Sequence, residues 1–148
     1  MQLNVLKGIT MSELKKAKKK TWTEFSKFIR TRDCILTTGT LDEGICISCN
    51  KRFDFKQLQA GHLIPGRYNV ILFDEEIVNA QCFACNMHLG GNTAEYYLSM
   101  VRRHNKKYVD ELLLRKFKPT IKFTIEGLNE MRLDYIRRTK IAIEEHLR

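Results

Sequence analysis

Four of the five cysteines form two pairs whose members are separated by two residues, Cys46/Cys49 and Cys82/Cys85. This spacing lets both sulfurs of a pair reach one ion at about 2.3 Å. Four thiolates give a closed tetrahedral site, which stabilises a fold and leaves no position open for a reaction. The odd cysteine count, with Cys34 left over, argues against a disulfide framework. The pattern predicts a structural zinc site. An iron site of the same spacing, and four free or disulfide-bonded cysteines, are the alternatives.

A histidine and an asparagine lie beside these pairs. His62 belongs to the stretch Gly-His-Leu-Ile-Pro at residues 61–65, and Asn86 directly follows the last cysteine. Neutral imidazole can take a proton from water at neutral pH, and a divalent cation such as Mg²⁺ or Mn²⁺ prefers oxygens like that of the Asn86 amide. A base and a divalent ion are the minimum for phosphodiester hydrolysis. The alternative is structural: a histidine beside a glycine, and an asparagine that caps a turn.

The elements that must position these residues fall into three parts. Residues 33–92 are rich in glycine, with short strands expected at 45–48 and 70–73. Helical periodicity predicts a helix from a cap at Ser12 to about residue 32, two helices over 93–104 and 109–117, and a final helix from Thr124 to about 147. We therefore expect an α+β fold in one compact unit. Its parts are a basic N-terminal helical arm (1–32), a zinc-bound finger (33–105) and a C-terminal helical region (106–148).

Positive charge is concentrated in the N-terminal arm. The chain of 148 residues has a net charge of +9, and residues 1–32 contain nine Lys or Arg against two Asp or Glu. A basic arm on a near-neutral body suits a polyanion, of which nucleic acid is the commonest, although a solvated helix face is the simpler alternative. The candidate phosphate contacts are Lys15, Lys16, Lys18, Lys19, Lys20, Arg67, Arg102 and Arg103.

No apolar run is long enough to span a bilayer, and the N-terminus lacks the apolar segment of a secretory signal. We therefore expect a cytoplasmic protein without a membrane partner. The final helix carries an apolar stripe that is expected to be core, or else a surface for a second copy of the chain: Leu128, Met131, Tyr135, Ile136, Ile143 and Leu147.

These motifs together resemble a known family. The two cysteine pairs, Gly61-His62, Asn86 after the last cysteine, Gly91-Asn92 and Tyr96 are similar to the NinG (Rap) recombination proteins of lambdoid phages. The segment at residues 25–33 also resembles the family's sequence before its first cysteine pair. The resemblance covers about residues 15–105. More distantly, the layout is similar to the phage resolvase endonuclease VII, a zinc-stapled nuclease of the ββα-metal (HNH, or His-Me finger) type.

The resemblance implies a DNA endonuclease for branched recombination intermediates, including Holliday junctions, in the cytoplasm of the host cell. His62 would be the general base, Asn86 a ligand of a catalytic Mg²⁺ or Mn²⁺, and the four cysteines the zinc ligands. The products would carry a 5′-phosphate and a 3′-hydroxyl. Symmetric cutting of a four-way junction needs two active sites, which favours a homodimer. The alternatives are a non-catalytic zinc-ribbon DNA-binding module and an HNH enzyme that nicks ordinary duplex.

One position departs from the endonuclease VII pattern. The residue before the histidine is there a metal-binding aspartate, whereas here it is Gly61, and Gly-His is the usual form in the NinG group. Another group must then replace the carboxylate, and the candidates are His88, Asn92, Glu95 and Asp74. The middle asparagine of HNH motifs, which supports the histidine loop, best matches Asn79, although its spacing to the second cysteine pair is short.

Overall fold

A long helix, α1 (Met11–Thr38), runs along the whole molecule in this computed structural model, which describes residue 8 and residues 10–148. The predicted cap, Ser12, is wrong, and Thr10 caps the helix instead. The Thr10 hydroxyl accepts a hydrogen bond from the Glu13 N–H, and the Glu13 carboxylate accepts one from the Thr10 N–H. The helix continues to Thr38, beyond the predicted end near residue 32, and stops where Gly39 adopts a left-handed conformation.

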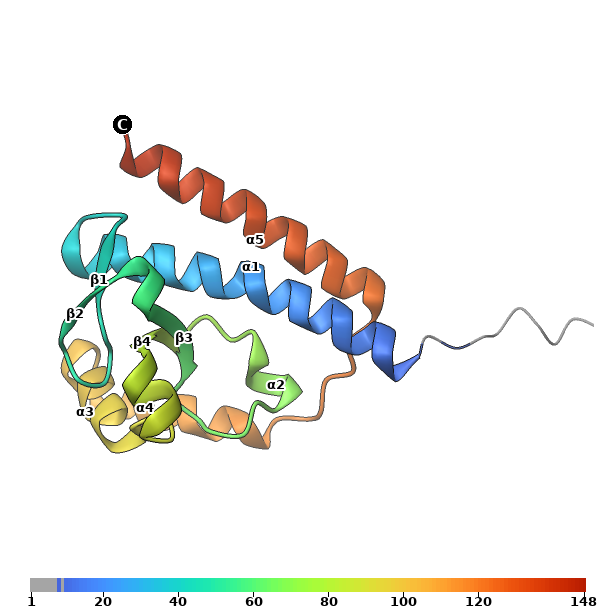
Figure 1. Cartoon of the computed structure of the whole chain (residues 1–148). Coiled ribbons are helices and arrows are strands. Elements are labelled where there is room, and N and C mark those ends of the chain that lie inside the picture. Colours follow the sequence, from blue (N-terminus) through green and yellow to red (C-terminus); the bar gives the residue numbers. More distant parts are fainter. Residues whose placement is uncertain (1–7, 9) are drawn as a thin grey trace, which may run out of the picture.

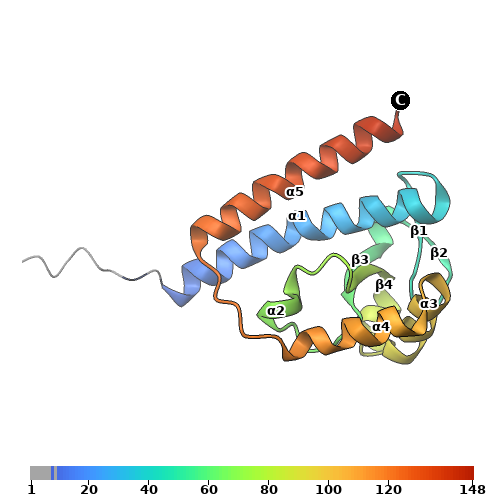
Figure 2. The same cartoon turned by 180° about the vertical axis from the view of Figure 1, so that it is seen from behind.

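A second long helix, α5 (Ile125–His146), packs against α1 in the same direction (Figures 1 and 2). Thr124 caps it as predicted, since its side chain accepts from the Gly127 N–H. The Thr21 hydroxyl of α1 donates to the carbonyl of Leu128, and Tyr135 packs edge-on against Phe25. The inner part of the stripe is therefore core, as expected. Two residues of the stripe, Ile136 and Leu147, are exposed, as are two other apolar residues of this part of the chain, Leu133 and Ile141.

Two antiparallel hairpins lie on the other side of α1. β1 (Glu43–Ile45) pairs with β2 (Arg52–Asp54), and β3 (Leu58–His62) pairs with β4 (Val78–Cys82). The strand predicted at residues 45–48 ends at Ile45, and the rest of that segment turns to present the first cysteine pair.

The strand predicted at residues 70–73 is wrong, because that segment forms the one-turn helix α2 (Asn69–Leu72). A short apolar run does not distinguish a buried helical turn from a buried strand by periodicity alone. Here Ile71 and Leu72 are buried, and the Ile71 N–H donates to the Tyr68 carbonyl, which closes a helical turn.

Shorter helices cover the opposite side of the hairpins (Figure 1). They comprise the π-helix η2 (Ala84–His88), α3 (Thr93–Arg103), α4 (Lys106–Leu113) and the 3₁₀ turn η3 (Leu114–Phe117). The 3₁₀ turn η1 (Phe55–Gln57) lies instead against α1, where the Arg30 guanidinium sits over the Phe55 ring. The prediction for α3 is confirmed. The helix predicted at 109–117 begins three residues earlier and ends in 3₁₀ form, because Asn105 caps it by accepting from the Tyr108 N–H.

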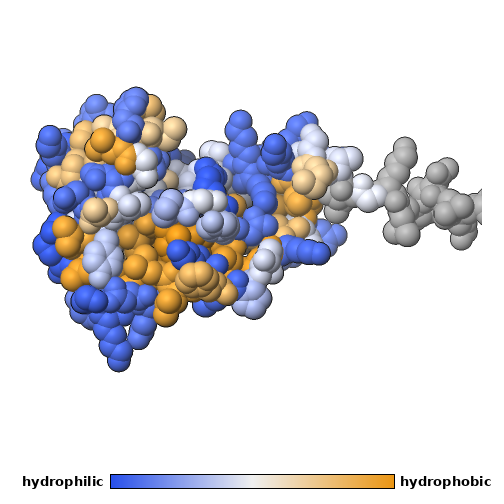
Figure 3. All heavy atoms as spheres, turned by 90° about the horizontal axis from the view of Figure 1, so that it is seen from below, coloured by the Kyte–Doolittle hydropathy of each residue, from blue (hydrophilic) through white to orange (hydrophobic). Residues whose placement is uncertain are grey.

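The largest apolar core lies between the β3–β4 hairpin and these helices, and it includes Ile47, Ile71, Ile77, Tyr96 and Met100. Viewed from below, apolar residues also gather on the surface (Figure 3). A groove of about 510 Å³ is lined by residues that include Leu63, Pro65, Leu114 and Phe117. Within the described residues, no helix combines the length and apolar character needed to cross a membrane.

Candidate metal centre and active site

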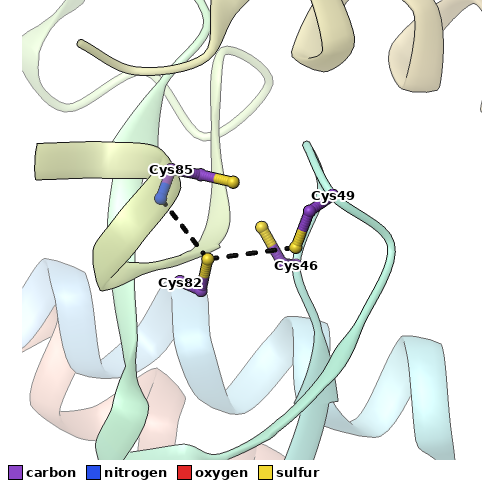
Figure 4. Close-up of side chains that lie close together, drawn as sticks. All are labelled: Cys46, Cys49, Cys82 and Cys85. Carbon is purple, nitrogen blue, oxygen red and sulfur yellow. Dashed lines mark hydrogen bonds between the residues drawn. The ribbon is translucent and has the colours of Figure 1, made fainter. Parts of the chain in front are cut away.

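The four paired cysteines converge on one point (Figure 4). The four sulfur atoms all lie within 4.8 Å of one another: those of Cys46, Cys49, Cys82 and Cys85. The Cys49 and Cys82 sulfurs are 3.9 Å apart. A tetrahedral site with zinc–sulfur bonds of about 2.3 Å places its sulfurs about 3.8 Å apart. The observed geometry fits that requirement, so these four cysteines can hold a zinc ion, as predicted.

Local backbone structure prepares both cysteine pairs. In the first, the Cys46 N–H donates to Lys51, the Asn50 N–H donates back to the Cys46 carbonyl, and Asn50 has a φ of 60°. In the second, the Cys85 N–H donates to the Cys82 sulfur at 3.4 Å. Burial raises the pKa of the Cys82 thiol to about 12, so a metal must displace its proton.

The fifth cysteine, Cys34, lies apart from this cluster. It is buried on α1 against Leu58 and Ala80. Burial, with the nearby Asp33 carboxylate, raises the pKa of its thiol to about 11. Cys34 is therefore the small buried apolar residue that the sequence indicates.

Gln81 connects the two cysteine pairs, a role that the sequence did not suggest. It is fully buried in β4, and its Nε2 donates to the Ser48 hydroxyl at 2.8 Å and to the Gly91 carbonyl at 2.5 Å. Its Oε1 lies only 2.0 Å from the position that a Cβ at residue 61 would occupy. Glycine before His62 is therefore a packing requirement of this site. The position of Gln81 immediately before Cys82 was the only available signal.

His62 ends strand β3 with its ring fixed on two sides. The imidazole stacks on Trp22 of α1, with ring centroids 5.3 Å apart and planes inclined by 15°. Its Nε2 lies 3.0 Å from the Leu72 carbonyl oxygen. Because a carbonyl only accepts, Nε2 is the donor and Nδ1 carries the free lone pair. Burial, reinforced by the nearby Arg67, lowers the pKa of His62 below its ordinary value of 6.5, although the Leu72 bond and Asp74 oppose the shift. The ring is therefore neutral at pH 7.

Asn86 lies on the other face of the same hairpin. Its Nδ2 donates to Gln59 Oε1 at 2.7 Å. Side chains alternate along a strand, so Gln59 and His62, three residues apart on β3, point to opposite faces. The sequence predicts phosphodiester hydrolysis by His62 as the base together with a divalent ion held by Asn86. The hydrogen bonds of the described residues do not bring His62 and Asn86 together.

Asn79 supports the histidine strand indirectly. Its Nδ2 donates to the Tyr96 hydroxyl at 3.0 Å, and its Oδ1 accepts from Arg32 at 3.3 Å. The Tyr96 hydroxyl in turn donates to the Gly61 carbonyl at 2.8 Å. Asn79 therefore acts on the backbone beside His62 through Tyr96, whose burial raises the pKa of its phenol.

The four candidates for a replacement ligand are engaged elsewhere or exposed. Both Asp74 oxygens accept from Arg115 at 2.9 Å, and the Asn92 amide donates to the Cys85 sulfur at 3.5 Å. His88 packs edge-on against Phe83, and Glu95 is exposed in the first turn of α3. None forms a hydrogen bond with His62 or Asn86.

Cations gather where α1 passes His62. Lys15, Lys18 and Lys19 precede Trp22 by seven, four and three residues, which places them on the same side of the helix. Lys18 donates to Asn69 at 2.8 Å, and the Arg67 guanidinium lies 4.7 Å from the Trp22 ring centre. The remaining candidate cations are exposed: Lys16 and Lys20 on α1, and Arg102 and Arg103 at the end of α3.

Comparison with known proteins assigns the family. Residues 6–145 match the family model described as bacteriophage lambda NinG protein. The chain belongs to the NinG family. The NinG match extends over nearly all of both long helices as well as the cysteine site, further than the 15–105 expected from the motifs. No curated protein and no solved structure matches the chain significantly.

Proposed function

We propose that this NinG-family protein is a metal-dependent DNA endonuclease that hydrolyses phosphodiester bonds in branched recombination intermediates such as Holliday junctions. The observation that carries the proposal is the 3.0 Å contact between His62 Nε2 and the Leu72 carbonyl. It fixes the tautomer that leaves Nδ1 free to accept a proton. Burial keeps the ring neutral, which is the form a general base requires.

The order of elements around His62 supports a nuclease of the ββα-metal type. His62 ends the first strand of an antiparallel pair, β3–β4, and α3 follows the second strand after the π-helix η2. Asn86 lies in η2, directly after the zinc ligand Cys85. This order of strand, strand and helix, with a histidine and an asparagine at these places, is the one expected of a zinc-stapled His-Me finger.

The charge distribution supports DNA as the substrate. The exposed Lys15 and Lys19 share the side of α1 that leads to Trp22, where Arg67 lies beside His62. Such cations bind phosphates without reading sequence. A backbone that follows α1 would thus bring a phosphate to His62.

In the proposed mechanism, His62 Nδ1 removes a proton from a water molecule as its oxygen attacks phosphorus, and the imidazolium keeps that proton. The positive charge of Arg67 stabilises the charge that develops on the phosphate. The bond to the 3′ oxygen breaks, and that oxygen takes a proton from solvent water, which leaves a 5′-phosphate and a 3′-hydroxyl. Asn86 would help to hold a divalent ion, which would supply electrostatic stabilisation of the charge on the departing oxygen. Symmetric junction cleavage would use two copies of the chain.

A second function, a non-catalytic DNA-binding module, is favoured by one observation. Among the described residues, the four cysteines are the only group of three or more His, Cys, Asp or Glu side chains that gathers closely enough to hold a metal ion. A nuclease ion would therefore rely on amide oxygens, water and phosphate.

Cleavage assays separate the two functions. Zinc-loaded protein is incubated with a four-way junction and with linear duplex of the same sequence, with and without Mg²⁺ or Mn²⁺. We expect ion-dependent cuts in the junction, and a loss of about 10²–10⁴-fold for His62→Ala, the usual scale of general-base catalysis. His146→Ala, near the end of α5, is the matched control and should cut normally. Equal cleavage by His62→Ala would refute the assignment of the base, and binding without any cleavage would favour the module.

A further inference from the structure

Two amide side chains meet on the face of the β3–β4 hairpin opposite His62. Asn86 Nδ2 and Gln59 Oε1 are 2.7 Å apart, although the residues are 27 positions apart in the sequence. Both side chains are half-buried. The second polar atom of each head group, Asn86 Oδ1 and Gln59 Nε2, forms no hydrogen bond with any described residue. The two head groups are therefore hydrogen-bonded to each other, while the second polar atom of each is available to bind a ligand.

The spacing of this pair suits a divalent cation. Two oxygens that bind one Mg²⁺ at about 2.1 Å from adjacent octahedral positions lie about 3.0 Å apart. The two head groups already lie at nearly that distance. Turning the Asn86 amide over exchanges its nitrogen and oxygen with little change in shape, and this directs two oxygens at one point.

The surroundings of the pair give two further, independent reasons to expect a cation site here. Asn86 belongs to the π-helix η2, a rare element that is frequent at functional sites, and it directly follows the zinc ligand Cys85. On the strand, Gln59 and Gly61 share one face, but Gln81 Oε1 fills the space that a side chain at 61 would need. A ligand on this strand face must therefore come from position 59.

We propose that Gln59 Oε1 and Asn86 Oδ1 form the protein part of a divalent-cation site, with Gln59 supplying the oxygen that Gly61 lacks. Water and a phosphate oxygen of the substrate complete the shell of this neutral oxygen pair. Use of the ion in cleavage rests on the proposed nuclease function, and it requires the substrate phosphate to lie at the end of β3, where it can reach both His62 and the amide pair. Binding of the ion does not.

The test is a gain of affinity. Gln59→Glu keeps the length of the side chain and its acceptor for Asn86 but adds a full negative charge. Mn²⁺ binding to the zinc-loaded protein is measured by electron paramagnetic resonance. We expect Gln59→Glu to tighten it by about tenfold, because ligand charge sets the affinity for hard cations. Gln57→Glu is the matched control: an exposed glutamine two residues upstream, with the same change of charge and no amide partner of this kind.

Two further variants locate the effect. Asn86→Leu in the Gln59→Glu background should abolish the gain, and Gly61→Asp should give none, because Gln81 occupies that space. Equal Mn²⁺ affinities of wild type, Gln59→Glu and Gln57→Glu would overturn the cation site, whether or not the protein cuts DNA. A tenfold gain confined to Gln59→Glu would support the cation site even if no variant cuts DNA, an outcome that would refute only the nuclease function.

Discussion

Gln81 Oε1 and the α-carbon of Gly61 face each other across the β3–β4 hairpin so closely that any side chain at position 61 would have to displace the glutamine head group. A Cβ there would lie 2.0 Å from the oxygen, and that oxygen is buried without a hydrogen-bond partner in the described part of the chain. The same glutamine holds Ser48 and Gly91 through its nitrogen. Gln81 thus links the segments that carry the four cysteines to the strand that carries His62.

Gly61→Ala should destabilise the protein by about 1–3 kcal/mol, the usual cost of inserting a methyl group into a packed site. Urea unfolding of the zinc-loaded protein measures this change in the free energy of unfolding. Gln81→Ala removes the clashing oxygen, so the double variant should lose less stability than the sum of the single ones. Strict additivity of the two changes would show that the contact does not limit position 61.

Removal of one zinc ligand should have a much larger effect. Cys49→Ser is expected to lower the zinc content well below one ion per chain and to unfold the β1–β2 turn, because structural zinc contributes on the order of 10 kcal/mol to the folded state. Cys34→Ala is the control, since Cys34 is equally a cysteine but lies in a separate apolar cluster. Metal analysis and circular dichroism provide the readouts. Full zinc content in Cys49→Ser would remove that residue from the site.

The sequence predicted those parts of this site that depend on residues close together in the chain. The cysteine cluster that can hold zinc follows from the spacing of Cys46/Cys49 and Cys82/Cys85, and the α5 start follows from the Thr124 cap. Contacts between distant segments were not predictable, because no local pattern encodes them. The stacking of Trp22 on His62 joins residues 40 positions apart, and the amide pair of Gln59 and Asn86 depends on strand register.

In α1, helical periodicity predicts which residues face the core but not which other segments they contact. The helical spacing of Trp22 and Phe25 predicts that both face the core, and both pack there. The period does not reveal that Trp22 also forms one wall of the His62 site and contacts Arg67. That information appears only when β3 is placed against the helix.

Acid should destabilise the fold through His62. Its pKa is lowered in the folded protein, so the unfolded chain binds the proton more tightly. The stability contributed by neutral His62 is complete above pH 6.5 and is lost as the pH falls from 6.5 toward the folded value. The groups that face the ring are Trp22, the Leu72 carbonyl, Arg67 and Asp74, of which only Asp74 and the carbonyl favour its protonation.

Urea unfolding between pH 5.5 and 7.5 tests this sign. His62→Gln retains an N–H for the Leu72 carbonyl but does not titrate. Its stability should therefore fall less steeply with acidification than that of the wild type. Zinc content is followed at each pH so that loss of metal is not mistaken for titration of His62. A wild-type stability that falls no faster than that of His62→Gln would contradict the lowered pKa.

The basic side of α1 should determine the salt dependence of DNA binding. If Lys19 contacts a phosphate, Lys19→Ala removes about one released counterion, so the slope of log K against log salt should become shallower by about 0.9. Lys140→Ala on α5 removes the same charge from an exposed position on another helix. Binding of a four-way junction is measured by fluorescence anisotropy over a range of salt concentrations. Equal slopes for the two variants would mean that DNA does not follow α1 to His62, and the approach of the phosphate would then have to be sought along α3, where Arg102 and Arg103 are exposed.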